Sequence, residues 1–313
     1  MTPPAGKGDP LKHFRSSSFS TGELARVRQL VNEYGKSLIL PYDQFVEHDC
    51  RHLEAESDSG NPHYIMELAL AGHYTGVAVH YGVASRYWSR AEGAVPLIVK
   101  LNGKTGIPSQ DQAFSAHTSF VEDALRIGAT AVGYTMYYGS PRTPDDLAQL
   151  ARVRKECDRY GLPLIVWAYP RGETMERKGG VNTSYALESA ARVAMEMGAT
   201  IIKSNVPSSA DDDFLENTGI PVYYRNLERE MRSVADTEAL QSRCDRIVQA
   251  AQGIPVLFSG GSLLSDEDLL YRADICVKAG CLGFIFGRNM WKRERSKALE
   301  ITEKLQALLR QAE

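Results

Sequence analysis

Two lysines interrupt strongly apolar segments, and either could act as a nucleophile. Lys203 lies within TIIKSNV (200–206), and Lys100 lies within VPLIVKLN (95–102). Apolar surroundings disfavour the charged form of a buried lysine and favour a neutral amine. A neutral amine can attack a carbonyl carbon and form a Schiff base. Spacing alone does not choose between Lys203 and Lys100. A strand-end lysine that reaches solvent or pairs with a carboxylate is the structural alternative.

Two aromatic residues and one aspartate could assist such a lysine. Trp167 and Tyr169 are two positions apart in LPLIVWAYP (162–170), so they share one face of a strand. A Tyr169 phenol facing a cavity could shuttle a proton to or from a carbinolamine or a substrate hydroxyl. Asp43 ends SLILPYD (37–43) and could hold the lysine or act as a base. The alternatives are core packing for the aromatic residues and a turn for the aspartate.

Glycine-containing segments after two strands predict a phosphate site. The residues are Ser259, Gly260, Gly261, Gly287 and Arg288. Such loops lead into helices and offer free backbone N–H groups to an anion. In barrels, the loops after the seventh and eighth strands are the recurrent phosphate site. Arg171, in YPRG, could bind a second anionic end of the substrate, and Lys100 could bind an anionic group if it is not the nucleophile.

One stretch, HDCRH (48–52), has residue types that bind metals. Its potential ligands are crowded into one segment, and no distant partner stands out in the sequence. This arrangement disfavours a zinc-dependent mechanism. We therefore predict no metal and no other cofactor beside the covalent lysine.

The elements that must position these residues are eight short apolar runs. They are 37–43, 75–81, 95–102, 131–138, 162–170, 200–206, 254–261 and 282–288. Helix-period segments fill most of the gaps between them, which indicates a parallel sheet covered by helices. Eight such units predict the α/β class and a single (β/α)8 TIM barrel, with an open doubly wound sheet as the alternative. Functional residues of a barrel lie where its strands end.

Two segments depart from this regular pattern. Residues 1–20 are rich in Pro, Gly and Ser and are predicted to be a flexible N-terminal extension, so that 21–313 form the barrel domain. The gap 207–253 after the sixth run is long. Its order is an acidic DDD, then IPVYYRN, and only then a helix. We interpret it as an elaborated loop at the rim of the site or at a subunit contact.

Composition excludes several partner classes. Among 313 residues, 36 are basic and 39 acidic, for a net charge of -3, so no bulk charge attracts nucleic acid or an anionic membrane. No apolar run approaches the roughly 18 residues of a membrane span. The five cysteines are scattered and odd in number, which favours reduced thiols and a cytoplasmic location.

Seven motifs in order carry a resemblance to a known family. They are LPYDQFVEH, VKLNGKT, AVGYTMYYGS, LPLIVWAYPRG, GATIIKSNVP, VLFSGGS and GFIFGRNMW. With these motifs, residues 37–295 resemble the archaeal-type class I fructose-bisphosphate aldolases, a branch of the DeoC-like aldolase superfamily.

The resemblance implies a role for each candidate residue. It makes Lys203, not Lys100, the Schiff-base lysine. Tyr169 becomes the acid/base residue with Trp167 beside it, and Asp43 matches the aspartate that ends the first strand. The implied reaction is reversible, metal-independent cleavage of fructose 1,6-bisphosphate to dihydroxyacetone phosphate and glyceraldehyde 3-phosphate, in glycolysis or gluconeogenesis. Family members are typically homo-oligomers built on a five-fold ring, up to a decamer.

The chain also departs from the family pattern. Phe45 and Asp49 replace glycines, and Ser262 stands where a proline is usual. These positions bear on substrate choice and phosphate geometry more than on the lysine. Two further hypotheses therefore stay open: a sibling Schiff-base transferase or thiolase acting on another phosphorylated ketose, and a catalytically silent barrel that serves as a scaffold.

Overall fold

Eight parallel strands close into a barrel, as the sequence predicts. The computed structural model describes residues 9–14, 19–47, 58–106 and 111–311. The order around the barrel is β1-β10-β9-β8-β7-β6-β3-β2, which rules out the open doubly wound sheet. The barrel strands are β1 (Ser37–Tyr42), β2 (Gly76–His80), β3 (Leu97–Lys100), β6 (Ala131–Tyr138), β7 (Leu164–Pro170), β8 (Ile201–Asn205), β9 (Val256–Ser259) and β10 (Gly283–Ile285).

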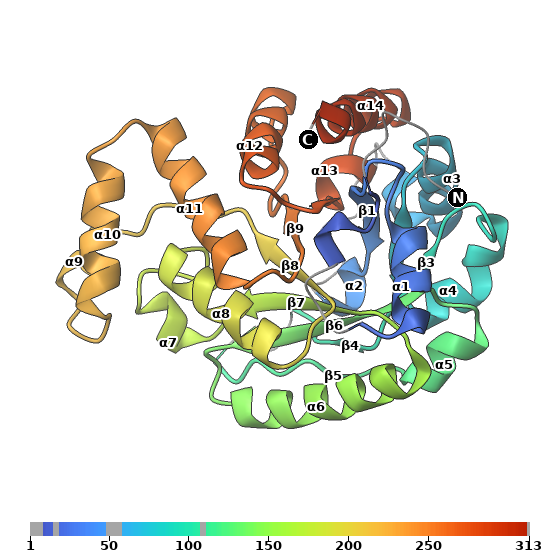
Figure 1. Ribbon diagram of the computed structural model, residues 1–313, viewed down its shortest axis with the longest axis horizontal. Coiled ribbons are helices and arrows are strands. Elements are labelled where there is room, and N and C mark those ends of the chain that lie inside the picture. Colours follow the sequence, from blue (N-terminus) through green and yellow to red (C-terminus); the bar gives the residue numbers. More distant parts are fainter. Residues whose placement is uncertain (1–8, 15–18, 48–57, 107–110, 312–313) are drawn as a thin grey trace.

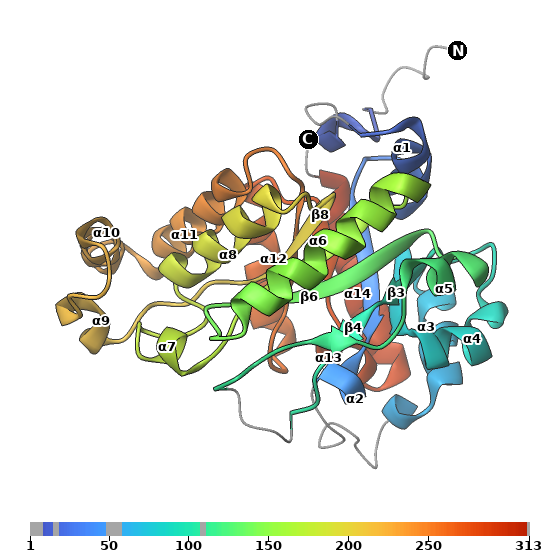
Figure 2. The ribbon, with the colours of Figure 1, turned by 90° about the horizontal axis from the view of Figure 1, so that it is seen from below.

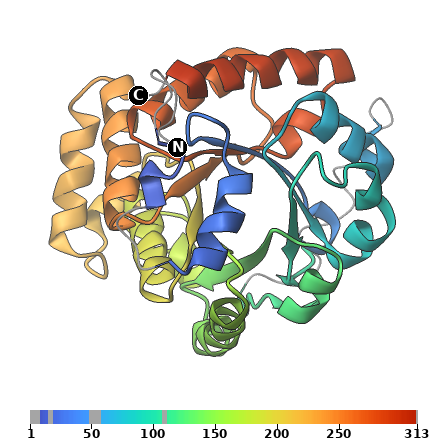
Figure 3. The same cartoon turned by 45° about the vertical axis from the view of Figure 1, so that its right-hand side comes forward.

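Helices form a ring around the barrel (Figure 3). The α-helices are α1 (Thr21–Val27), α2 (Gln44–Glu47), α3 (Pro62–Ala71), α4 (Tyr81–Tyr87), α5 (Val121–Arg126), α6 (Thr143–Tyr160), α7 (Glu173–Glu176), α8 (Ser184–Glu196), α9 (Asp212–Glu216), α10 (Val222–Arg232), α11 (Asp236–Ala250), α12 (Asp266–Lys278), α13 (Arg288–Trp291) and α14 (Arg295–Gln311). Short 3-10 helices are η1 (Lys12–Phe14), η2 (Arg28–Leu30), η4 (Asp58–Gly60) and η5 (Trp88–Arg90). A small antiparallel pair joins β4 (Asn102–Gly103) to β5 (Ala116–His117).

The two ends of the barrel are closed differently. In Figure 2, α1 lies at one end of the molecule, and α2 and α13 lie at the opposite end. Since α2 follows β1 and α13 follows β10, the end with α2 and α13 is the one where the strands finish. Polar residues at the strand ends therefore gather there, which is the location that the barrel fold predicts for a functional site.

Alternate residues of each strand enter two separate hydrophobic cores. Ile165 and Ile201 belong to the core inside the barrel. Their neighbours Val166 and Ile202 belong to the larger core between the sheet and the helices. This alternation is why the strands read as continuous apolar runs, because both faces are buried.

The N-terminal segment takes part in the core inside the barrel. Phe14, in η1, is buried and packs with Val27 and Leu30 against the amino ends of the strands. The packed chain thus includes Lys12–Phe14, ahead of the boundary predicted after residue 20. Residues 1–8 and 15–18 lie outside the described residues. A single buried aromatic among Pro, Gly and Ser is a weak sequence signal, which explains the difference.

The predicted insertion after the sixth strand is present and more helical than expected. α9 and α10 project from the ring of helices beside α11 (Figure 1). The sequence predicts that residues 222–226 precede a helix, but they form the first turns of α10, which begins directly after Pro221. Buried Glu228 of α10 pairs with Arg243 of α11 at 2.9 Å and joins these two helices of the segment. Among the described helices, none is long and apolar enough to cross a membrane.

Candidate active site

A central cavity opens at the end of the barrel where the strands finish. Nine of the predicted site residues line it: Asp43, Tyr169, Arg171, Lys203, Ser259, Gly260, Gly261, Gly287 and Arg288. Asn205, Asn289 and Trp291 line it as well. Lys100 and Trp167, both predicted to bind substrate, are fully buried and are not among the lining residues. The structure places both directly beneath the cavity.

Lys203 points into the barrel near the carboxyl end of β8. Its residue is 5% exposed, and its Nζ lies 4.7 Å from the centre of the Trp167 ring and 5.3 Å from that of Tyr169. Within the described part of the chain, Nζ has no carboxylate or hydrogen-bond partner. The inward orientation expected from the strand pattern is therefore present. An amine in this position can reach a carbonyl group in the cavity.

Trp167 separates the two candidate lysines. The Nζ atoms of Lys100 and Lys203 each lie 4.7 Å from the centre of its ring. The indole occupies this position because Gly133, on the neighbouring strand, has no side chain. A Cβ at Gly133 would lie 2.6 Å from the Trp167 ring and 2.8 Å from Lys100 Cδ. Trp167 thus forms the floor beneath Lys203 and is placed to hold its amine toward the cavity.

Lys100 forms part of a buried ionic cluster. Its ammonium donates to Glu47, donates to Thr135 Oγ1 at 2.7 Å, and lies 3.5 Å from Asp43 Oδ2. Burial alone would lower the pKa of Lys100, but the carboxylates of Glu47 and Asp43 outweigh it and hold the pKa above its usual value. Lys100 therefore stays a cation. A charged, paired lysine is a poor nucleophile, so the geometry favours Lys203 over Lys100.

Tyr169 and Arg171 form one wall of the cavity. Tyr169 stands two positions beyond Trp167 on β7, and the Arg171 guanidinium lies 5.0 Å from the centre of its ring. Arg171 also donates to the carbonyl of Pro170 at 2.8 Å. The phenol and the guanidinium thus face the same space as Lys203. Tyr169 could exchange a proton with a bound molecule, and Arg171 could bind an anionic group.

Glycine residues let two loops approach each other across the cavity. Gly261 has φ +64°, a conformation that favours glycine. A Cβ at Gly260 would lie 2.6 Å from Asn289 Nδ2, and one at Gly287 would lie 3.0 Å from the carbonyl oxygen of Pro41. Arg288, the first residue of α13, completes this part of the lining. Backbone donors and a guanidinium are the groups that bind phosphate.

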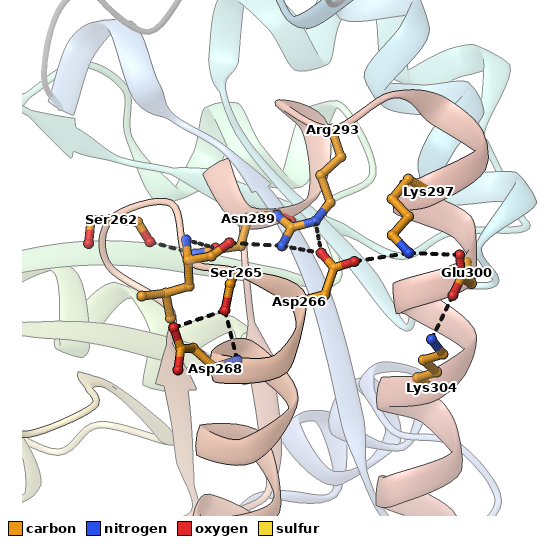
Figure 4. Close-up of polar contacts among 10 residues, drawn as sticks. Ser262, Ser265, Asp266, Asp268, Asn289, Arg293, Lys297, Glu300 and Lys304 are labelled. Atoms are coloured by element: carbon orange, nitrogen blue, oxygen red, sulfur yellow. Dashed lines mark hydrogen bonds and ion pairs between the residues drawn. The ribbon is translucent and has the colours of Figure 1, made fainter.

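A polar network joins the loop 260–265 to α13 and the residues that follow it (Figure 4). The buried Asn289 side chain accepts from the backbone N–H of Leu264 and donates to the carbonyl of Ser262, both at 2.8 Å. Arg293 donates to the carbonyls of Leu264 and Asn289 and to the carboxylate of Asp266. These bonds hold the loop 260–265 against α13. The glycine-rich loop is therefore fixed in position before any anion binds.

Replacing Asn289 with alanine should weaken the binding of phosphorylated ligands. The change leaves the Leu264 N–H and the Ser262 carbonyl unpaired, at about 1 kcal/mol each. We expect KM for a phosphorylated ketose to rise about tenfold, with a smaller change in kcat, in steady-state assays. Glu300→Gln, at the exposed outer end of the same network, is the control and should leave KM unchanged. An unchanged KM for Asn289→Ala would show that the clamp does not shape the phosphate site.

Three further residues belong to the site. Asn205 and Asn289 line the cavity and are polar residues that follow the sixth and eighth apolar runs, with Asn289 in the GRN segment of the predicted phosphate site. Sequence reasoning gave no role to Glu47. Glu47 follows Asp43 by one helical turn, a spacing that could have suggested a shared face. No cluster of three metal-binding side chains occurs among residues 9–14, 19–47, 58–106 and 111–311. HDCRH, with Asp49, lies outside the described residues.

Fold and site place the protein among (β/α)8-barrel proteins whose cavity carries a lysine amine. The family model for DeoC/LacD family aldolases matches residues 37–293. The chain is 35% identical over 260 residues to a fructose-bisphosphate aldolase class 1 of Thermoproteus tenax, covering 83% of this chain and 84% of that protein. This protein therefore belongs to the DeoC/LacD family of aldolases, as the resemblance implied.

Two further comparisons bear on the activity. The structure of an archaeal fructose-1,6-bisphosphate aldolase, with its catalytic lysine covalently bound to a carbinolamine intermediate, superposes with a TM-score of 0.74 at 31% identity. The match covers 92% of this chain and 99% of that one. A 2-amino-3,7-dideoxy-D-threo-hept-6-ulosonate synthase of Halobacterium salinarum is 29% identical over 70% of this chain and 68% of that protein.

Proposed function

We propose that this protein is a class I fructose-bisphosphate aldolase that reversibly cleaves fructose 1,6-bisphosphate to dihydroxyacetone phosphate and glyceraldehyde 3-phosphate. The observation that carries the proposal is Lys203. Its amine faces a cavity that also contains a phenol, two guanidinium groups and a glycine-rich loop. The archaeal relatives that bear this activity support the choice of substrate.

The proposed chemistry begins at the ketone carbon C2. The Lys203 amine attacks C2 to give a carbinolamine, which loses water and becomes an iminium ion. Removal of the C4 hydroxyl proton then lets a carbonyl form at C4 as the C3–C4 bond breaks. The electron pair of that bond moves into the iminium and gives an enamine. Glyceraldehyde 3-phosphate leaves, a proton returns to C3, and water releases dihydroxyacetone phosphate from the lysine.

Other lining residues take supporting roles in this proposal. The Tyr169 phenol transfers protons at the carbinolamine and at the C4 hydroxyl, and Asp43 orients substrate hydroxyls or acts as a second base. The phosphate nearer the ketone binds the cradle of Ser259, Gly260, Gly261, Gly287 and Arg288. Arg171 binds the other phosphate.

Borohydride trapping tests the proposal directly. Reduction in the presence of fructose 1,6-bisphosphate should convert the iminium into a stable secondary amine, and peptide mass mapping should place it on Lys203. We expect cleavage to continue in EDTA, because the iminium formed on the lysine accepts the electron pair without a metal or another cofactor. A strict metal requirement, or an adduct on Lys100, would overturn this mechanism. Absence of any adduct would favour the scaffold hypothesis.

The proposal extends to the location, pathway, partners and assembly of the protein. We infer that the protein acts in the cytoplasm, in glycolysis or gluconeogenesis, on a small sugar phosphate, with no nucleic acid or membrane partner. We also propose a homo-oligomer, with the five-fold ring or decamer of the resembling family as its form. The net charge of -3 supports the absence of nucleic acid and membrane partners. The buried cysteines without disulfides among the described residues support a cytoplasmic location.

One relative gives a specific reason to keep a second candidate. The synthase of Halobacterium salinarum covers most of this chain, so a transferase or thiolase acting on another phosphorylated ketose is the alternative. Phe45 and Ser262, at the departures from the aldolase pattern, would set this choice. Comparing the rates on fructose 1,6-bisphosphate and on other phosphorylated ketoses separates the two. A faster aldol transfer with another ketose would favour the synthase-like activity.

A further inference from the structure

A second cavity adjoins the central one on the far side of the glycine-rich loop. We call it the side cavity. Its lining includes Arg272 of α12, Asn182, and Ser208 at the start of the insertion. Asn205, Ser259 and the backbone of 260–261 line both cavities. The two cavities therefore adjoin each other and share these lining residues.

The chemistry of the side cavity favours an anion. Arg272 is half-buried, and its guanidinium forms no hydrogen bond or ion pair with any residue in the described ranges. The described lining contains amides, hydroxyls and glycine backbone but no carboxylate. On the same helix, by contrast, Lys278 pairs with Asp274 at 2.6 Å. A partly desolvated guanidinium without a counter-charge, surrounded by donors, is suited to phosphate.

A hydrogen-bond chain connects the side cavity to the central one. Ser259 Oγ donates to Asn205 Oδ1 at 2.6 Å, and Asn205 Nδ2 donates to Asn182 Oδ1 at 2.8 Å. The side-chain oxygen of Asn182 therefore already accepts a hydrogen bond, and its amide nitrogen can donate to a ligand. Asn205 stands two positions beyond Lys203 on β8. An anion in the side cavity would thus act on residues that also face the proposed nucleophile.

We propose that the side cavity binds a phosphate-class anion, with Arg272 as its principal ligand. The occupant is either the second phosphate of a bisphosphate substrate or a separate phosphate that modulates the reaction. This inference rests on the proposed function only in the choice between these two sources of the phosphate. If the second phosphate of the substrate binds here, Arg272 takes the role proposed above for Arg171.

Phosphate binding tests the side cavity when the central cavity is already filled. The borohydride-reduced adduct of dihydroxyacetone phosphate fills the central phosphate cradle, and inorganic phosphate is then titrated by calorimetry. We expect a phosphate site that is weakened about tenfold or more in Arg272→Gln and largely kept in Arg272→Lys, whether or not a second phosphate binds at Arg171. Lys278→Gln removes an equal charge from the same helix and should leave binding unchanged. Equal phosphate binding by the wild type and Arg272→Gln would overturn the proposal.

Steady-state kinetics identify the source of the phosphate. If it belongs to the substrate, Arg272→Gln should raise KM for fructose 1,6-bisphosphate about tenfold and leave KM for fructose 1-phosphate unchanged. If it is separate, both KM values should stay the same, and the effect of added inorganic phosphate on the rate should disappear. If no adduct forms at all, the proposed function fails, and titration of the unmodified wild type and Arg272→Gln still tests the side cavity.

Discussion

Replacing Lys203 with methionine should abolish adduct formation and lower kcat/KM for fructose 1,6-bisphosphate by about 10⁴-fold or more. Methionine is unbranched and only one atom shorter than lysine, and it suits the buried position near Trp167 and Tyr169. The fold should therefore survive, and the loss can be assigned to the missing amine. Mass spectrometry after borohydride reduction and steady-state assays measure the two effects separately.

Tyr169→Phe is the matched variant for this test. It removes only the hydroxyl, so the amine can still condense with the ketone. We expect turnover to fall by about 10²- to 10⁴-fold while a borohydride-trapped adduct still forms. Residual activity of Lys203→Met close to that of the wild type would place the nucleophile elsewhere, and Lys100 would be the next candidate. Unchanged turnover of Tyr169→Phe would remove the phenol from proton transfer.

The barrel and most of the cavity lining could be predicted because both follow local rules. Strands of a parallel barrel are buried on both faces, so each leaves a continuous apolar run in the sequence. The carboxyl ends of those strands meet at one end of the barrel, so polar residues that follow the runs converge there. Lys203 and Tyr169 follow this rule, because TIIKSNV and LPLIVWAYP place them near the carboxyl ends of their strands and both line the cavity.

The same rules do not predict how deeply a side chain near a strand end is buried within the barrel. Lys100 and Lys203 both stand near a strand end, yet one is buried in an ion pair and the other lines the cavity. The difference depends on Glu47, which lies 53 residues before Lys100 and reaches it only after the barrel closes. Pairings at such separations depend on tertiary geometry, which strand periodicity does not encode.

Replacing Glu47 with glutamine should destabilise the protein by about 3–5 kcal/mol, because it leaves the buried Lys100 without its closest counter-charge. Glu47 also accepts from Thr135 at 2.5 Å and from the Tyr137 hydroxyl at 3.2 Å, so the change disturbs three partners. Adding Lys100→Met removes the uncompensated charge and should restore part of the loss. Denaturant unfolding of the single and double variants measures both effects.

The pH dependence distinguishes the ion pair from simple packing. Burial alone would raise the pKa of Glu47, but Lys100 overrides it and holds the pKa below its usual value. The contribution of the carboxylate is therefore complete above the ordinary glutamate pKa and is lost as the pH falls through the folded pKa. The stability difference between the wild type and Glu47→Gln should be largest near neutral pH and should narrow in acid. A difference that stays constant across that range would mean that shape, and not charge, makes Glu47 stabilising.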